Sequence, residues 1–304
     1  MAMVSFIDDN FTLAEGFLKR DYAEIGNLIR KEKEKLTIYE ETDDLLVGCM
    51  VTKNIPLSNL YKGEFYVVRF LCANVDTMHN EKQMNCIIEL LKKLKERIEK
   101  NKGYYNFRIP SHIVDIIKAY NVVFQGGIFC GGTVEEIISG KSVSNQLKDG
   151  LKVFFGNSSY IEKHKNTLMD MTYKSFESYQ GQYHLSYVTE EKAGKIYENW
   201  IESSLNECND KNVIIAEYEG SPIGFVTIAE KEHAVEGVLS AVENKHRKLG
   251  AYRAMISYIV NYANENGKSF ITSTQFDNFI VQGVWNSIGL KPFYSIYNFH
   301  ILSE

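Results

Sequence analysis

The spacing of apolar residues in the second half of the chain predicts strands and helices in a regular succession. Short apolar runs typical of strands stand at 151–155, 212–218, 223–229, 235–242, 268–275 and 294–302. Between them apolar residues recur every three or four positions, which predicts helices at 160–176, 189–205, 251–265 and 278–287. The predicted order is β-α-α-β-β-β-α-β-α-β, and a four-residue loop, Glu219–Pro222, closes a hairpin.

The first half repeats part of this order. Strand patterns lie at 44–51, 63–72, 104–109 and 122–130, and an apolar stripe predicts a helix at 81–100. A second helix is expected from Pro110 through Tyr120. Because residues 139–152 are polar and rich in turn formers, they suit a linker. We therefore expect an α/β (α+β) protein with two domains, 1–145 and 151–304, each a mixed central sheet flanked by helices.

Composition and charge narrow the range of functions. The 304 residues carry a formal net charge of −5, which argues against a nucleic-acid binder. The stretch of eighteen apolar residues needed for a membrane span is missing, as is a charged leader, so we expect a cytoplasmic protein. The cysteines are odd in number and form no CxxC pair, which favours free thiols over disulfides or a metal site: Cys49, Cys72, Cys86, Cys130 and Cys208.

The strongest chemical signal is the strand 235–242, its basic turn, and the helix that follows. A helix that begins just after a strand presents unpaired backbone N–H groups and a positive dipole end, which together bind phosphate. Gly250 permits close approach of the backbone, while Arg247 and Arg253 add positive charge. The segment lacks both GxxxxGK[ST] and GxGxxG, so it is neither a P-loop nor a dinucleotide fingerprint.

Arg247-x-x-Gly250-x-Tyr252 resembles the Q/R-x-x-G-x-G/A acyl-CoA motif of the GNAT N-acetyltransferases, with Tyr252 in place of the last small residue. The stretch 274–290 resembles the family's closing motif, in which Asn278 would touch the cofactor. The resemblance implies tandem GNAT-like domains with acetyl-CoA as cosubstrate. The residues it places at the cofactor are Ser240, Ala241, Val242, Arg247, Lys248, Leu249, Gly250, Ala251, Tyr252, Arg253, Asn278 and Trp285.

The corresponding connector of the first half, 73–81, departs from this pattern. It contains two acids and neither glycine nor arginine, so its backbone could not approach a pyrophosphate closely and its acids would repel one. We expect the first domain to be a degenerate copy that does not bind acyl-CoA.

Acetyl transfer to an amine needs a bound thioester, a neutral amine and a proton for the leaving thiolate. The resemblance places the thioester carbonyl near the backbone of Val242 and suggests Glu236 as base. The even spacing of the two residues predicts that they share one face of the strand. A solvent-facing structural carboxylate is the alternative reading of Glu236.

The acid is harder to assign, because Trp285 occupies the family's usual tyrosine position and an indole cannot supply the proton. A neighbouring tyrosine, namely Tyr252, Tyr294 or Tyr297, or a water molecule must then act. We select Tyr294 as the catalytic acid.

The acceptor is suggested by residues 184–205, which resemble a stretch of TDP-fucosamine N-acetyltransferases and related nucleotide-sugar enzymes. His184 would then lie near the sugar, or else be a surface residue. Arg69 and Arg108 would meet substrate phosphates, or else form interdomain ion pairs. The sequence thus predicts an N-acetyltransferase for a nucleotide-linked amino sugar. Its partner would be this small-molecule amine, and a homodimer is compatible with the sequence. The alternatives are another small amine, an amino acid or an antibiotic as acceptor, or a non-catalytic acyl-CoA-binding module.

Overall fold

The chain divides into two compact units. Unit 1 comprises Met1–Val134 and Phe293–Glu304, and unit 2 comprises Glu135–Pro292. The computed structural model describes residues 37–41, 46–73, 81–111, 114–144, 147–179, 181, 183, 193–207 and 210–303.

The sheet of unit 1 has the strand order β1-β2-β3-β4-β11-β5. Its strands are β1 (Ile38–Glu41), β2 (Leu46–Lys53), β3 (Phe65–Ala73), β4 (Gly103–Pro110), β5 (Ile128–Ile138) and β11 (Lys291–Ser303). The β3–β4 pair is parallel, whereas β1–β2, β2–β3 and β4–β11 are antiparallel. The sheet is therefore mixed, as predicted.

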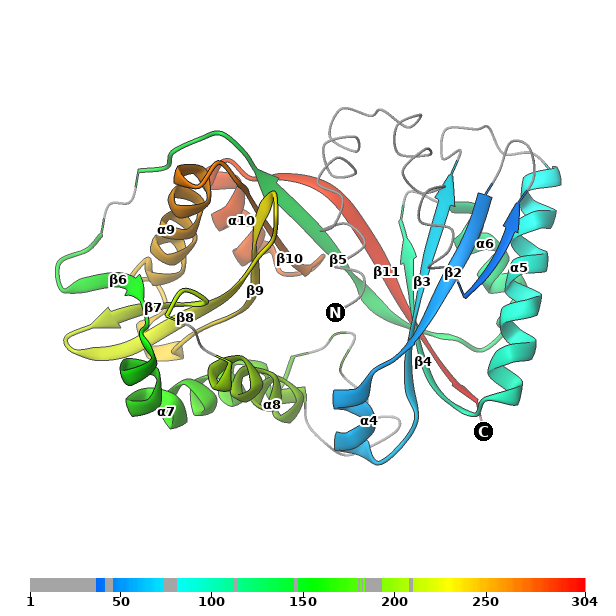
Figure 1. Ribbon diagram of the computed structural model, residues 1–304, viewed down its shortest axis with the longest axis horizontal. Helices are drawn as coiled ribbons and strands as arrows, with labels where there is room; N and C mark the ends of the chain where they lie inside the picture. Colours follow the sequence, from blue (N-terminus) through cyan, green and yellow to red (C-terminus); the bar gives the residue numbers. More distant parts are fainter. Residues whose placement is uncertain are drawn as a thin grey trace. The chain divides into compact units, whose positions relative to one another are not determined.

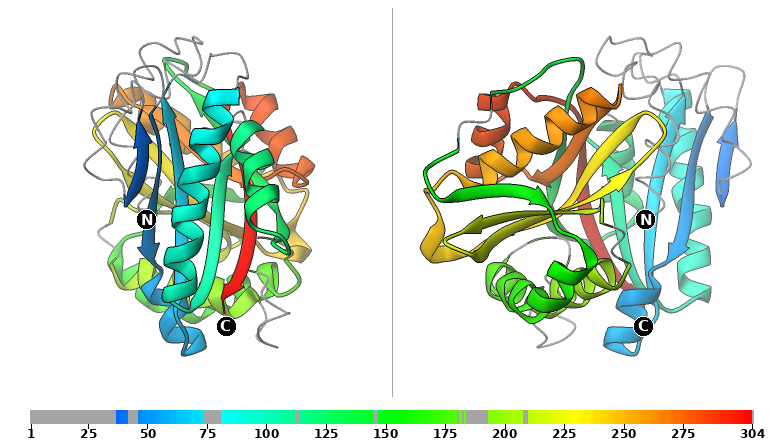
Figure 2. Two further views of the ribbon diagram at one scale, coloured as in Figure 1. Left: turned by 90° about the vertical axis from the view of Figure 1, so that its right-hand side faces the viewer. Right: turned by 60° about the vertical axis from the view of Figure 1, so that its left-hand side comes forward.

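One face of this sheet is covered by α5 (Glu81–Lys100) and α6 (Val114–Val123), which Figure 2 shows in front of the strands in its left view. The α5 stripe buries Leu90, Leu91 and Leu94 completely. Phe107 of β4 packs edge-on against Tyr120 of α6, with ring centroids 5.1 Å apart. These residues belong to one apolar cluster, which is the core of unit 1.

The elements of unit 1 differ from the prediction in several places. Pro110 ends β4, opposite Ile296 of β11, instead of starting a helix, so α6 begins at Val114. Val123 packs into the core as the last residue of α6, and β5 starts only after Gly126 turns the chain with a φ of 93°. The helix α4 (Ile55–Tyr61) was not predicted, although Asn54 caps it in the usual way.

The sheet of unit 2 has the order β10-β9-β8-β7-β6, and the last residues of β5 precede β10. Its strands are β6 (Leu151–Phe155), β7 (Val213–Tyr218), β8 (Ser221–Glu230), β9 (Ala234–Val242) and β10 (Ser269–Gln275). Figure 1 shows α9 (Ala251–Glu265) and α10 (Phe279–Ile288) on one side of these strands. The other side carries α7 (Ser158–Phe176) and α8 (Ala193–Asn206). Each pair of helices closes its own apolar core against the sheet.

The predicted element order of unit 2 is confirmed, with two local differences. The hairpin loop has two residues, since Ser221 and Pro222 already belong to β8; Glu219 and Gly220, with φ of 50° and 79°, form the tight turn. The linker region docks on unit 2: the backbone of Val143 donates to and accepts from the Asn261 side chain of α9, at 2.7 and 2.9 Å. The start of the predicted helix 189–205 lies outside the described residues before Ala193.

The last strand differs from the predicted division, which counted 151–304 as one domain. From Gly103 to Pro110, β4 pairs antiparallel with β11 over eight residue pairs. Phe299 of β11 lies 4.7 Å from the ring of Tyr120, inside the core of unit 1. The chain's final strand therefore completes the sheet of the first unit, because its apolar residues alternate toward α5 and α6.

Candidate functional site

The strand β9 has an irregular ladder at its centre. Against β8, Thr227 pairs with Leu239 and Ile228 with Gly237, so Val238 is an extra residue, a β-bulge. Against β10, pairing runs in parallel only from Ala234 to Gly237. Beyond this point β9 continues to Val242 with no β10 partner in the ladder. The backbone edge of residues 238–242 is thus available to a ligand.

Two threonines from the neighbouring strands fix the bulge. The hydroxyl of Thr227 on β8 accepts from the Leu239 N–H at 3.1 Å. The hydroxyl of Thr272 on β10 donates to the Gly237 carbonyl at 3.2 Å. Both threonines are buried, so these bonds are shielded from water. The interruption of the ladder is therefore held by side chains on both sides.

The bulge at Val238 reverses the alternation of side chains along β9, so residues before and after it with the same parity face opposite sides of the sheet. Val235 packs in the core beneath α9 and α10, whereas Ala241 packs in the core beneath α7 and α8, although both have odd numbers. Glu236, the neighbour of Val235, therefore faces α7 and α8, while Val242 faces α9 and α10. The prediction that Glu236 and Val242 share a face is wrong, because the bulge at Val238 shifts the alternation by one residue.

Gly250 shapes the connection from β9 to α9. It is the N-cap of α9 with φ of 82°, and it follows Lys248, which also has a positive φ of 79°. The first helical hydrogen bond runs from the Ala254 N–H to the Gly250 carbonyl at 2.9 Å. The N–H groups of residues 251–253 precede it, so the helix itself offers them no carbonyl acceptor. A Cβ built on Gly250 meets nothing within 4 Å. There is therefore open space beside Gly250 at the start of α9, which fits a pyrophosphate.

The positive side chains around this turn have different roles. Arg247 is exposed and, within the part of the chain that the structure describes, its side chain makes no hydrogen bond or ion pair. Arg253 donates to the Ser287 hydroxyl of α10. Glu243 engages Lys245 at 3.0 Å and His246 at 2.8 Å. Arg247 is thus the arginine best placed to meet a phosphate.

Tyr252 and Trp285 meet beside β9. The indole N–H of Trp285 donates to the Tyr252 hydroxyl at 3.0 Å, and Tyr252 also hydrogen bonds with the Ser240 side chain. Burial raises the pKa of Tyr252 to about 12, against the lowering effect of these two hydrogen bonds. The structure therefore brings together three of the predicted cofactor residues, from β9, α9 and α10.

Asn278 has a structural partner. Its side chain caps α10 by accepting from the Val281 N–H at 3.4 Å, and it donates to the Thr274 hydroxyl at 2.9 Å. Its predicted contact with the cofactor stays a prediction.

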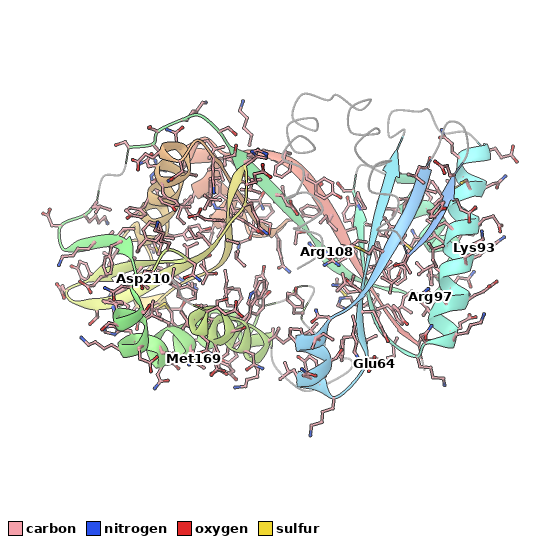
Figure 3. All side chains as sticks on the ribbon, viewed as in Figure 1. Glu64, Lys93, Arg97, Arg108, Met169 and Asp210 are labelled. Carbon is pink, nitrogen blue, oxygen red and sulfur yellow. The ribbon has the colours of Figure 1, made fainter. Side chains whose placement is uncertain are left out.

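The remaining predicted residues lie elsewhere. Arg108, labelled in Figure 3, is on β4 of unit 1, and Tyr294 is on the part of β11 that belongs to unit 1. His184 lies outside the described residues. Their substrate and acid roles stay predictions.

The sequence reading missed Glu136 of β5, which is 2% exposed. Its carboxyl group acts electrostatically to raise the pKa of Tyr252, and its Oε2 has no hydrogen-bond partner among the described residues. The signal in the sequence was a pair of glutamates, Glu135 and Glu136, between the apolar residues Val134 and Ile137 of one strand.

Comparisons with known proteins agree with this geometry. Residues 169–290 match the model of the acetyltransferase (GNAT) family. The GCN5-related N-acetyltransferase of Sphaerobacter thermophilus aligns with a TM-score of 0.56 at 9% identity, covering 86% of this chain and 77% of that one. The fold is that of the GNAT acetyltransferases. The GNAT prediction is confirmed at this level, and since the alignment covers more than unit 2 contains, it extends into unit 1.

Two further solved structures align with most of the chain. A functionally unknown conserved protein of Staphylococcus epidermidis aligns with a TM-score of 0.50 at 15% identity, covering 88% of this chain and 96% of that one. The glucosamine N-acetyltransferase region of a fungal multi-domain β-N-acetylglucosaminidase gives 0.54 at 10% identity, covering 85% of this chain and 31% of that one. A comparison with curated proteins finds no match.

The described ranges contain neither a membrane-spanning helix nor a cluster of metal-binding side chains. No helix is long and apolar enough to cross a membrane. No group of three or more His, Cys, Asp or Glu side chains could hold a metal ion. Cys49, Cys86 and Cys130 form no disulfide within these ranges.

Proposed function

We propose that the protein is an N-acetyltransferase that binds acetyl-CoA in unit 2. One observation carries the proposal. After the bulge at Val238, β9 has no β10 partner in the ladder, and this segment leads to the start of α9, where Gly250 is the N-cap. The edge of 238–242, which has no β10 partner in the ladder, offers N–H and C=O groups to the amide-rich pantetheine arm, and the first-turn amides of α9 suit its pyrophosphate. Bound acetyl-CoA would supply an acetyl thioester for attack by an amine.

Under this proposal the chain's own residues have separate tasks. Gly250 and the amides of Ala251 to Arg253 hold the pyrophosphate, with Arg247 beside them. Glu236 faces α7 and α8, on the opposite side of the sheet from Tyr252 and Trp285. The amine would therefore approach from the α7 and α8 side, where Glu236 takes its proton directly or through water.

For the acceptor we propose a primary amine, with a nucleotide-linked amino sugar as the first candidate. The support is the resemblance of residues 184–205 to nucleotide-sugar N-acetyltransferases. Glucosamine is a second candidate, because one structural neighbour is a glucosamine N-acetyltransferase region. We also propose a cytoplasmic location and a first unit that does not bind acyl-CoA.

The test combines calorimetry with an acetyl-transfer assay. Titration with acetyl-CoA should return one site per chain, and free thiol should appear when TDP-linked amino sugars, glucosamine, polyamines or amino acids are added. Two equivalent sites would contradict the degenerate first unit. Binding without thiol release on any amine would favour the non-catalytic module.

Glu236→Gln tests the base. The variant keeps the shape and removes the charge, so turnover should fall by about a hundredfold or more while acetyl-CoA affinity stays unchanged. Raising the pH should partly restore the rate, because more of the amine is then neutral in solution. Glu232→Gln, at an exposed position before β9, is the matched control and should leave the pH profile intact. Wild-type turnover of Glu236→Gln across the pH range would exclude the base role.

A further inference from the structure

Tyr252, Ser240, Trp285 and Glu136 form a polar cluster within the apolar core beneath α9 and α10. Trp285 is 1% exposed and Glu136 2% exposed. The aromatic ring of Tyr252 and the Ile138 side chain, two residues after Glu136, pack against that same core. The cluster is therefore shielded from water at the point where β9, α9 and α10 meet.

The hydrogen bonds fix the orientation of the phenol. An indole N–H can only donate, so the Tyr252 oxygen accepts from Trp285 at 3.0 Å. The Ser240 hydroxyl also donates to this oxygen, since its hydrogen bond lowers the pKa of Tyr252, and the phenolic proton is left for a ligand atom. Ser240 lies two residues beyond the bulge, on the segment of β9 that has no β10 partner. The Tyr252 hydroxyl thus contacts the segment of β9 along which the pantetheine arm is proposed to run.

We propose that Tyr252 donates the proton to the leaving thiolate and replaces the hydroxyl that α10 lacks at Trp285. The inference rests on the proposed acetyl-transfer function. When the amine nitrogen bonds to the carbonyl carbon, the C–S bond breaks and its electron pair passes to sulfur. The Tyr252 O–H bond then breaks and its proton forms the thiol. The amine gives up its own proton to Glu236, and the phenolate is reprotonated from solvent after the thiol product has left, so the protons balance over the cycle.

Trp285 makes this donation feasible. Burial holds the pKa of Tyr252 at about 12, so an unassisted phenol would release its proton reluctantly. The Trp285 N–H strengthens its bond as negative charge grows on the Tyr252 oxygen, which stabilises the phenolate. Burial also raises the pKa of Glu136, which favours its neutral form and limits the repulsion that a carboxylate would exert on the phenolate.

The experiment compares two acyl donors, acetyl-CoA and acetyl-seleno-CoA, with Tyr252→Phe. A selenol is more acidic than a thiol, so its anion leaves without a proton. With acetyl-CoA, kcat should fall by about a hundredfold at unchanged KM for the donor. With the selenoester, the variant should approach the wild-type rate. Tyr258→Phe is the matched control: it removes a hydroxyl from the same helix, where the ring packs against Phe155 at 5.6 Å, and should match wild type on both donors.

The outcomes separate the inference from the proposed function. A Tyr252→Phe enzyme with wild-type kcat on acetyl-CoA, or with an equal loss on both donors, overturns the proton-donor role while acetyl transfer stands. A wild-type protein that releases no thiol with any amine overturns both. If Tyr252→Phe does not fold, Trp285→Phe decides: it should show the same donor-dependent loss to a smaller degree, and an equal loss on both donors contradicts the proposal.

Discussion

The strands β3 and β9 occupy equivalent positions in the sheets of the two units, but only β9 has an extra residue in its ladder. Each is antiparallel to a preceding strand, parallel to the following one, and followed by a helix. The β2–β3 ladder runs from Leu46 to Lys53 without a register shift, whereas the β8–β9 ladder is interrupted at Val238. The connectors also differ in sequence, since only the second contains glycine and arginine.

This difference separates what makes the fold from what makes the site. A continuous ladder satisfies every backbone group of a strand and leaves nothing for a ligand. The bulge in β9 gives up that pairing over a few residues, and the buried hydroxyls of Thr227 and Thr272 compensate. Unit 1 therefore shows the architecture built for stability, and unit 2 the same architecture opened at one point.

The largest expected effect tests where the last strand belongs. Phe299→Ala removes a ring packed against Tyr120 and Phe129, and it should lower the unfolding free energy of unit 1 by about 3 kcal/mol. Hydrogen exchange should accelerate in α5 and β4 while α9 keeps its protection. Leu302→Ala, at an exposed position of the same strand, is the control and should change little. Accelerated exchange confined to α9 would contradict the assignment of β11 to unit 1.

The next effect tests the proposed pyrophosphate site at the start of α9. Gly250→Ala places a side chain at a φ of 82°, where non-glycine residues are disfavoured, and in the space that the pyrophosphate would need. Acetyl-CoA affinity should fall at least about tenfold, since each lost charged hydrogen bond is worth about 1.5–3 kcal/mol. Calorimetry measures it.

Gly267→Ala is the matched control for Gly250. It also has a positive φ, 67°, with nothing within 4 Å of an added Cβ, but it lies at the opposite end of α9. The two variants should lose similar stability and differ in affinity. Equal acetyl-CoA affinities of the two variants would contradict a pyrophosphate site at the start of α9.

The smallest effect tests the bulge. Thr227→Val leaves the buried Leu239 N–H without its partner and should destabilise unit 2 by about 1–3 kcal/mol in urea unfolding. Thr167→Val makes the same chemical change at an exposed position of α7 and serves as control, with little change expected. An unaltered midpoint for Thr227→Val would show that the bulge does not depend on this hydroxyl.

Periodicity predicted most of the fold because it reports which face of an element is buried. The stripe of α5 gave its bounds, and the strand and helix order of unit 2 follows the same signal. The features that periodicity missed include the partner of β11 and the start of α6 after Pro110. Both depend on pairing between segments far apart in sequence, which local spacing does not encode.

The site was predictable where its chemistry is local. Gly250 and the amides after it lie in one turn, so their role could be inferred from residue type. The facing of Glu236 could not, because the bulge at Val238 leaves no mark in the hydrophobic pattern. The contact between Tyr252 and Trp285 joins two helices, and Glu136 comes from another strand altogether. Such contacts require the tertiary structure.

The membership of β11 in unit 1 has a consequence for synthesis on the ribosome. The β4 strand emerges early, but the strand that covers its edge follows about 180 residues later, on the order of ten seconds or more at 5–20 residues per second. During that interval the nascent first unit presents an unpaired strand edge with residues that are buried in the finished protein, including Phe107 and Ile109. The amino-terminal unit is thus the last to be completed, and a ribosome that stalls late should leave an aggregation-prone fragment.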